Sequence, residues 1–266
     1  MTSALFSHEV LVALGICFAA AMATLVGAFP AFTSRGGNPR VLALGLAFAG
    51  GAMVYVSFVE ILGKALHSFG SVTDEKTAYI DATLAFFGGM AFIILIDRLI
   101  PNPHNELTEP HGEPDKGKLG RLGMLAGFAI TAHNFPEGMA TFFSTLEDPV
   151  VGLSLALAIA VHNIPEGISI AIPVYYATGS RKMAVISCLF SGLAEPVGAL
   201  LGYLILAPFL SPYVYGSVFG AIAGAMVFLS LDELLPTAKR YAKGHDAVYG
   251  MVGGMAVMAL SLILFK

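Results

Sequence analysis

Long apolar stretches recur from one end of the chain to the other, and no other feature limits its fold as strongly. Only 12% of the 266 residues are charged and 56% are hydrophobic, whereas a water-soluble domain carries about 25% charged residues. The stretches are apolar throughout and do not alternate with polar residues, which excludes a transmembrane β-barrel. The sequence therefore predicts an all-α integral membrane protein.

Eight stretches are long enough to cross a membrane, since a helix needs about 20 apolar residues to span the hydrocarbon. The predicted spans cover residues 8–29, 40–63, 77–98, 120–144, 149–177, 183–207, 213–238 and 246–265. Residues 1–266 thus form a single polytopic domain. The one long connection, residues 101–119, is polar and rich in proline, which predicts a flexible loop. His104 and His111 in this loop could bind metal weakly, but a solvated tether is the favoured interpretation because their spacing fits no closed site.

The basic residues predict the orientation of these spans. With eight spans, both ends of the chain lie on the same side of the membrane. Assigning loops to alternate sides places eleven of the 14 Lys and Arg residues on one side and three, Lys64, Lys76 and Lys266, on the other. Short loops rich in Lys and Arg stay in the cytoplasm. The loop 101–119 is therefore predicted to be cytoplasmic and both termini to be outside.

Two pairs of spans repeat each other in sequence. Residues 50–62 share seven of thirteen residues with 223–235, including a Ser-x-x-Glu, and residues 81–92 resemble 246–257. The loop count gives the two members of each pair opposite directions. Inverted repeats are typical of secondary transporters that bind their cargo near the midplane of the membrane. The predicted layout is 3+2+3: spans 1–3 and 6–8 arranged around spans 4 and 5.

The two central spans carry the same polar hexapeptide, HNFPEG at 133–138 and HNIPEG at 162–167. Within each copy the His and Glu lie four residues apart, so both can face the same side of a helix. The proline frees a backbone carbonyl in the preceding turn. Imidazole, amide, carboxylate and a spare carbonyl together provide nitrogen and oxygen ligands that suit a divalent cation.

Acidic residues inside the hydrocarbon need compensation, because each costs about 2.5–3.5 kcal/mol at the centre of a membrane helix. A bound metal ion would supply it for Glu137 and Glu166. A third carboxylate, Glu195 in span 6, is placed at similar depth and could complete the cluster. The alternative is that these polar groups only hydrogen-bond helices together, and the duplication of the motif argues against it.

HNFPEGMATF and HNIPEGISIAIP resemble the signature segments of the ZIP (Zrt/Irt-like) family of divalent-metal transporters. The resemblance extends to eight spans, outside termini and a variable cytoplasmic loop between spans 3 and 4. It implies two adjacent metal positions bridged by two of the glutamates. The first is formed by His133, Glu137, His162 and Glu166, and the second by Asn134, Asn163 and Glu195 with Glu137 and Glu166 bridging.

The resemblance implies uptake of Zn²⁺ into the cytoplasm, with breadth toward Fe²⁺, Mn²⁺, Co²⁺ and Cd²⁺. Where some members have Gln, this chain has His162, which makes the first position richer in nitrogen and better suited to zinc, while the second suits harder ions. The implied location is a bacterial inner (plasma) membrane, and the family is often dimeric and proposed to move like an elevator. The expected partners are divalent ions, lipid and a second copy in a homodimer, with no prosthetic group and no nucleic acid.

Other polar residues in the spans are candidates for lining the cation path: Glu60, Asp232, Glu233, Thr141 and Ser169. Glu60 and Glu233 lie near opposite ends of their helices and could form outer and inner stations for a cation. An ion pair of Glu60 with Lys64, one turn later, is an equally good interpretation. The two hydroxyls could instead satisfy helix backbones.

A function of another class uses the same ligands. An intramembrane zinc hydrolase would need a zinc-activated water, but the chain lacks H-E-x-x-H, and the two motifs leave no obvious open coordination position. A passive metal channel would use the same residues as a carrier, and the sequence does not separate these two.

Overall fold

The computed structural model describes residues 7–29, 32, 39–99, 131, 134–135, 137–209 and 211–264. Within these ranges the chain is helical and contains no strand, as the sequence predicts. The helical elements follow one another as α2 (His8–Ala21), α3 (Ala23–Val26), α4 (Pro39–Val56), η2 (Ser57–Ile61), α5 (Leu62–Gly70), α6 (Glu75–Leu99), α8 (Pro149–Thr178), α9 (Arg181–Leu206), η4 (Ala207–Phe209), α10 (Pro212–Leu229), η5 (Ser230–Leu234), α11 (Leu235–Tyr241) and α12 (Asp246–Leu264).

Seven stretches of helix in the described part are long and apolar enough to cross a membrane. They are His8–Val26, Ala43–Gly70, Glu75–Leu95, Pro149–Ile168, Arg181–Phe209, Pro212–Tyr241 and Asp246–Leu264. The predicted fourth span, 120–144, falls largely outside the described residues, although residues 137–147 are helical. The second span runs further than the predicted 40–63, because the helix continues without a break through η2 and α5.

Side-chain caps define where several helices begin. The Asp148 carboxylate accepts hydrogen bonds from the Val150 and Val151 amides at 2.8 and 3.2 Å, with Pro149 as the first residue of α8. These bonds satisfy amides that have no partner inside the helix. Asp74 acts similarly before α6, and hydrogen bonds from the Thr77 hydroxyl and amide lower the pKa of its carboxyl.

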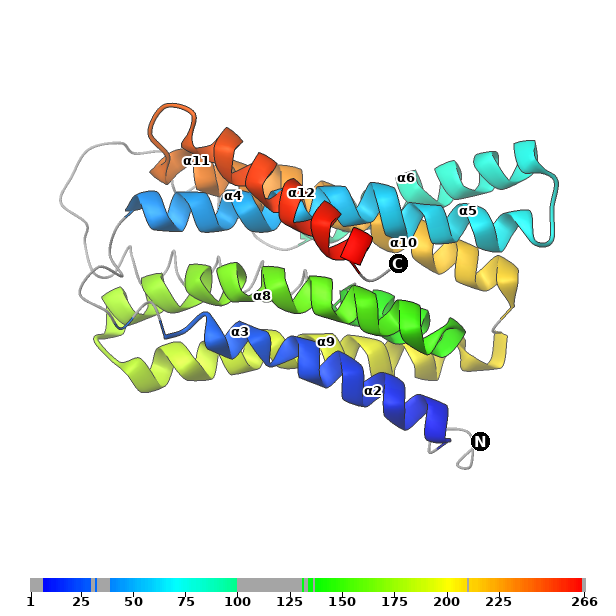
Figure 1. Ribbon diagram of the computed structural model, residues 1–266, viewed down its shortest axis with the longest axis horizontal. Helices are drawn as coiled ribbons and strands as arrows, with labels where there is room; N and C mark the ends of the chain where they lie inside the picture. Colours follow the sequence, from blue (N-terminus) through cyan, green and yellow to red (C-terminus); the bar gives the residue numbers. More distant parts are fainter. Residues whose placement is uncertain are drawn as a thin grey trace.

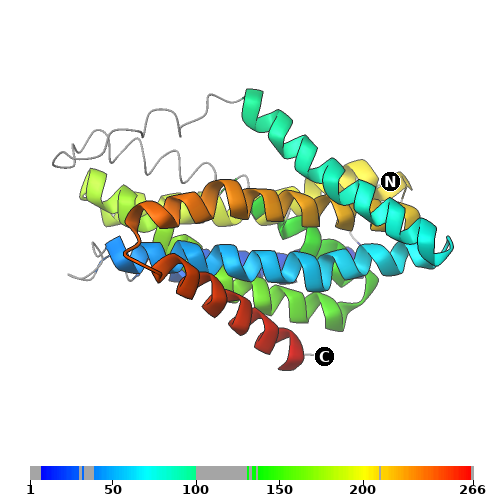
Figure 2. The ribbon, with the colours of Figure 1, turned by 90° about the horizontal axis from the view of Figure 1, so that it is seen from above.

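The helices form two layers (Figure 1). One layer contains α4, α5, α6, α10, α11 and α12, and the other contains α2, α3, α8 and α9. Both α4 and α12 pack on α8, which joins the layers. Seen from above, α4–α5 and α10–α11 run side by side in opposite directions, while α6 and α12 lie obliquely against them (Figure 2). The two helices of the sequence repeat are therefore antiparallel neighbours.

Glycines at matched positions set how closely the repeated segments pack. A Cβ at Gly51 would overlap the backbone of Met251, and a Cβ at Gly224 would overlap the backbone of Phe86. The sequence alignment equates Gly51 with Gly224 and Phe86 with Met251, so one backbone contact occurs twice. The same pairing relates two further contacts: Gly89 with the Ala221 backbone and Gly254 with the Phe48 backbone.

The repeated Ser-x-x-Glu coincides with an irregular turn in both copies. A π-helical turn begins at Ser57 in η2 and at Ser230 in η5, and these serines are aligned in the repeat. Glu60 lies inside the first turn and Asp232 inside the second, and both are half-buried. Single π-helical turns inside α-helices are frequent at functional sites.

Large apolar side chains cover the outside of the bundle. Phe190 is 73% exposed, Ile263 is 72% exposed and Leu84 is 66% exposed. In water such a surface would carry a large hydrophobic cost, whereas in a bilayer it is the required surface. The protein is therefore an integral membrane protein.

Adjacent glycines in α6 allow a matched test of this packing. Gly89 faces the α10 backbone, whereas an added Cβ at Gly88 meets nothing within 4 Å. We expect Gly89→Ala to destabilise the protein by about 1–3 kcal/mol through overpacking, and Gly88→Ala to be neutral or slightly stabilising. Thermal unfolding in detergent measures both. Equal effects of the two substitutions would contradict the assigned packing.

Candidate metal site

Five of the seven predicted metal ligands have side chains that are completely buried. They come from the helix at residues 137–147 with the residues just before it, from the middle of α8 and from α9: Asn134, Glu137, Asn163, Glu166 and Glu195. Each has a relative exposure of 0%. His133 lies outside the described residues, and for His162 the structure describes the backbone in α8 but not the side chain.

The Asn163 amide connects three helices at this place. Its Nδ2 donates to Glu195 Oε1 at 2.6 Å and to the Ala20 carbonyl at 3.1 Å. Asn163 belongs to α8, Glu195 to α9 and Ala20 to α2. The two donor hydrogens of the amide are thereby both used.

Asn134 makes an equivalent connection from the other copy of the motif. Its Nδ2 donates to the Ser191 carbonyl at 3.1 Å and to the Ser191 hydroxyl at 3.3 Å. In both asparagines the amide nitrogen thus donates to groups of neighbouring helices, while the amide oxygen has no hydrogen-bond partner among the described residues.

Several buried oxygens at the site have no hydrogen-bond partner among the described residues. They are Asn134 Oδ1, Asn163 Oδ1 and Glu195 Oε2. A buried acceptor without a partner costs about 1–3 kcal/mol. Amide and carboxylate oxygens are ligands that divalent cations accept. A cation bound here would satisfy atoms that the protein itself leaves unsatisfied.

The three carboxyl groups also interact electrostatically. The carboxyl group of Glu166 is close enough to those of Glu137 and Glu195 for electrostatic repulsion, and the same holds for Glu195 and Glu137. Like charges repel strongly in a medium of low dielectric constant, and a cation between them would remove that repulsion. Within the described part of the chain, no three His, Cys, Asp or Glu side chains are close enough to form a complete metal site; the two motif histidines are not among the side chains described.

The glycines that close each motif permit the close backbone approach expected of them. A Cβ at Gly138 would overlap the Glu195 backbone, and a Cβ at Gly167 would overlap the Thr24 backbone. The hexapeptides therefore pack directly on α9 and on α3, with no side chain between. The fully buried carboxylates of Glu137 and Glu166 directly precede these closely packed glycines.

A further repeat in spans 1 and 6 was missed by sequence reasoning. The pattern Cys-x₈-Val-Gly-Ala begins at Cys17 and again at Cys188, a signal that a search for internal repeats could have found. The Cys17 thiol lies 3.7 Å from the Gly138 carbonyl and the Cys188 thiol 3.4 Å from the Gly167 carbonyl. The two cysteines hold equivalent positions against the two motifs.

The remaining predicted residues lie in different surroundings. Thr141 is fully buried one turn after Glu137, and its hydroxyl has no hydrogen-bond partner in the described ranges. Lys64 forms an ion pair with Glu147 at 3.7 Å. The side chains of Ser169 and Glu233 lie outside the description. A path through any of these residues stays a prediction.

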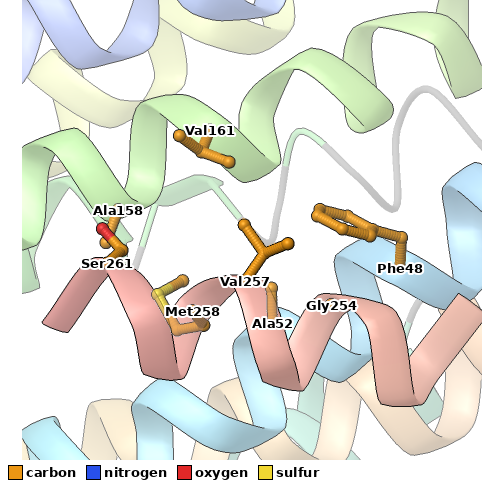
Figure 3. Close-up of a pocket in the computed structure, with 8 residues that line it drawn as sticks. All are labelled: Phe48, Ala52, Ala158, Val161, Gly254, Val257, Met258 and Ser261. Carbon is orange, nitrogen blue, oxygen red and sulfur yellow. The ribbon is translucent and has the colours of Figure 1, made fainter. Parts of the chain in front are cut away.

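The pocket drawn in Figure 3 is a different place. It lies where α4, α8 and α12 meet and is lined by Phe48, Ala52, Ala158, Val161, Gly254, Val257, Met258 and Ser261. With one hydroxyl among apolar groups, it offers no ligand set for a cation. It belongs to the apolar seam between the two layers.

The fold and the site define a membrane protein with a polar centre enclosed by lipid-facing helices. A family model described as ZIP Zinc transporter matches residues 101–262. The chain is 62% identical over 257 residues to the zinc transporter ZupT of Neisseria meningitidis serogroup B, which covers 96% of each chain. It is 57% identical over 262 residues to ZupT of Stenotrophomonas maltophilia, covering 97% of each chain, and 46% identical over 266 residues to ZupT of Chlorobaculum parvum. The chain belongs to the ZIP zinc transporter family.

The predicted resemblance to the ZIP family is thereby confirmed, and the similarity extends to bacterial ZupT proteins. Members of this family are transporters, so the protein is a transporter and not an enzyme. The intramembrane hydrolase is set aside on this ground.

The two asparagines give a prediction about stability. Asn163→Ala removes bonds to two different helices, whereas both bonds of Asn134 go to one residue. We expect Asn163→Ala to lower the free energy of unfolding by about 2–3 kcal/mol and Asn134→Ala by about 1 kcal/mol, because each leaves buried groups unsatisfied. Denaturation of metal-free protein in detergent measures the difference, and a larger loss for Asn134→Ala would contradict the described geometry.

Proposed function

We propose that the protein carries Zn²⁺ across the bacterial inner membrane into the cytoplasm through a binuclear site. The proposed ligands are His133, Asn134, Glu137, His162, Asn163, Glu166 and Glu195. The observation that carries the proposal is a set of fully buried oxygens without hydrogen-bond partners among the described residues, provided by both copies of the motif and by α9. The relatives are named zinc transporters, which supports zinc as the cargo.

The two metal positions would differ in chemistry. The first would combine two imidazoles with two carboxylates, a set that suits Zn²⁺. The second would be formed by amide and carboxylate oxygens, which suit harder ions and would admit Fe²⁺, Mn²⁺, Co²⁺ and Cd²⁺ less selectively. Glu137 and Glu166 would bridge them.

The proposed architecture has eight spans arranged 3+2+3, works as a homodimer and places both termini outside. The paired glycine contacts of α4 with α12 and of α6 with α10 support the inverted repeat. The helix at 137–147 supports the C-terminal part of a fourth span. The basic loops support the orientation.

Passage of the cation requires ligands of moderate strength, since an ion held too tightly is not released. The half-buried Glu60 and Asp232 in the π-helical turns, with Glu233, would receive the ion outside and inside. Thr141 and Ser169, one turn beyond the bridging glutamates, would line the route between.

Zinc uptake into proteoliposomes tests this function. We expect Glu166→Gln to slow Zn²⁺ uptake at least about tenfold, because it removes a charged ligand at a cost of about 1.4 kcal/mol or more. Glu75→Gln, on the exposed first turn of α6, is the matched control and should transport like the unchanged protein. Equal zinc uptake by Glu166→Gln and the unchanged protein would refute the assigned site.

Cysteine labelling tests the orientation. Val72→Cys lies between α5 and α6 and Lys182→Cys at the start of α9, both at exposed positions, while the native Cys17 and Cys188 are fully buried. In intact cells a membrane-impermeant maleimide should label Val72→Cys and should reach Lys182→Cys only after the membrane is opened. The reverse pattern would invert the proposed topology.

A further inference from the structure

The contacts of the two motifs are related by an approximate twofold symmetry. Asn163 donates to the Ala20 carbonyl, and Asn134 donates to the Ser191 carbonyl, each at 3.1 Å. Residues 20 and 191 differ by the same interval as Cys17 and Cys188, whose thiols face the two equivalent glycine carbonyls. The same interval pairs Thr24 of α3 with Glu195 of α9.

The backbone at Thr24 and Glu195 obeys this symmetry. The Glu195 backbone presses on Gly138, and the Thr24 backbone presses on Gly167. The next contact along the chain also repeats, with Gly198 on the Phe135 backbone and Gly27 on the Ile164 backbone. Thr24 therefore holds the position toward one motif that Glu195 holds toward the other.

The Thr24 hydroxyl is buried and unsatisfied. The residue has a relative exposure of 0%, and its Oγ1 has no hydrogen-bond partner in the described part of the chain. A threonine inside a helix usually donates to the carbonyl four residues earlier. Here that carbonyl belongs to Ala20 and accepts a hydrogen bond from Asn163 instead.

Thr24 also lies near the helical turns that carry two acidic residues of the site. A Cβ at Gly192 would lie 3.4 Å from Thr24 Oγ1, and Gly192 is one turn before Glu195 on α9. The Thr24 carbonyl meets Gly167, the residue after Glu166. Thr24 thus stands between the turns that carry Glu166 and Glu195.

We propose that Thr24 is a further oxygen ligand of the transported cation. It provides a neutral hydroxyl at the position where the symmetry of the site would place a fourth carboxylate. This inference rests on the proposed transport function and names a residue of that same site. With a hydroxyl at this position, the site has three carboxylates. A fourth would add repulsion when the site is empty and would hold a divalent ion more tightly when it is full.

Replacing the Thr24 hydroxyl by a methyl group distinguishes a role as metal ligand from a purely structural role. We expect Thr24→Val to weaken Zn²⁺ binding by about threefold to tenfold, the effect of losing one neutral polar contact. The same variant should raise the unfolding midpoint of metal-free protein by about 2–4 °C, because a buried unsatisfied hydroxyl is gone. Thr24→Ser should bind zinc like the unchanged protein.

Thr145→Val is the matched control for loss of a buried hydroxyl. Thr145 is 3% exposed and its hydroxyl donates to the Thr141 carbonyl at 2.7 Å, so its loss should lower the midpoint and leave zinc affinity unchanged. A lower midpoint with unchanged zinc affinity for Thr24→Val would overturn the proposal and make Thr24 a structural residue.

Exchanging the two symmetry-related side chains gives a second test that does not depend on the first. Glu195→Thr alone should weaken Zn²⁺ binding at least about tenfold. In the double variant Thr24→Glu with Glu195→Thr, the carboxylate would face Asn134 as Glu195 now faces Asn163, and affinity should return to within about threefold of the unchanged protein. No recovery in a double variant with an unchanged unfolding midpoint would overturn the symmetry argument.

Equilibrium dialysis of purified protein against ⁶⁵Zn²⁺ measures affinity in all variants, with Glu166→Gln beside them. If Glu166→Gln loses zinc and Thr24→Val does not, the role of Thr24 alone is refuted. If neither loses zinc, the proposed site as a whole is refuted.

Discussion

The burial of acidic and amide groups inside a lipid-embedded bundle is the constraint on which the rest of the structure depends. The hydrocarbon core of a bilayer offers no water, so polar atoms buried there must find their partners within the protein or in a cargo ion. The amide nitrogens of Asn134 and Asn163 are satisfied by carbonyls of α9 and α2 and by Glu195. Their amide oxygens have no hydrogen-bond partner among the described residues. The nitrogens therefore fix the position of each side chain, while the oxygens stay available to a cation.

Repetition explains how so many polar groups reach one place. The glycine contacts recur in pairs, Gly138 with Gly167 among them, so each stretch of backbone that positions a ligand has a counterpart. Chemistry differs where the symmetry is broken. Thr24 occupies the position in α3 that is equivalent to Glu195 in α9, and Thr141 occupies the position in the first motif that is equivalent to Ile170 in the second. The scaffold is nearly symmetric, whereas the ligands are not.

The two layers contain different features of the molecule. The motifs, α2, α3 and α9 form one layer, and the four-helix repeat of α4, α6, α10 and α12 forms the other. The seam between them is apolar where α4, α8 and α12 meet, and the Lys64–Glu147 ion pair links the layers elsewhere. The polar centre therefore lies inside one layer and does not form part of the seam.

Much of the fold and the site followed from the sequence. Hydropathy determined the class, because a chain with so few charges must place its helices in lipid, and the duplicated hexapeptide identified the asparagines and glutamates that are buried together. The repeat of α4 with α10 was readable because identical residues recur at one spacing. The repeat of α2–α3 with α9 was missed, since small apolar residues match by chance and only Cys17 and Cys188 mark it clearly.

Tertiary structure alone decided which atoms remain without partners and which residues meet across the symmetry. The repeat that begins at Cys17 and Cys188 aligns Thr24 with Glu195, but the two residues are chemically unlike and the sequence does not show that they meet equivalent partners. Their equivalence arises from two backbones that press on two glycines. Likewise, Lys64 forms an ion pair with Glu147, which is far away along the chain, because packing, which no local pattern encodes, brings those charges together.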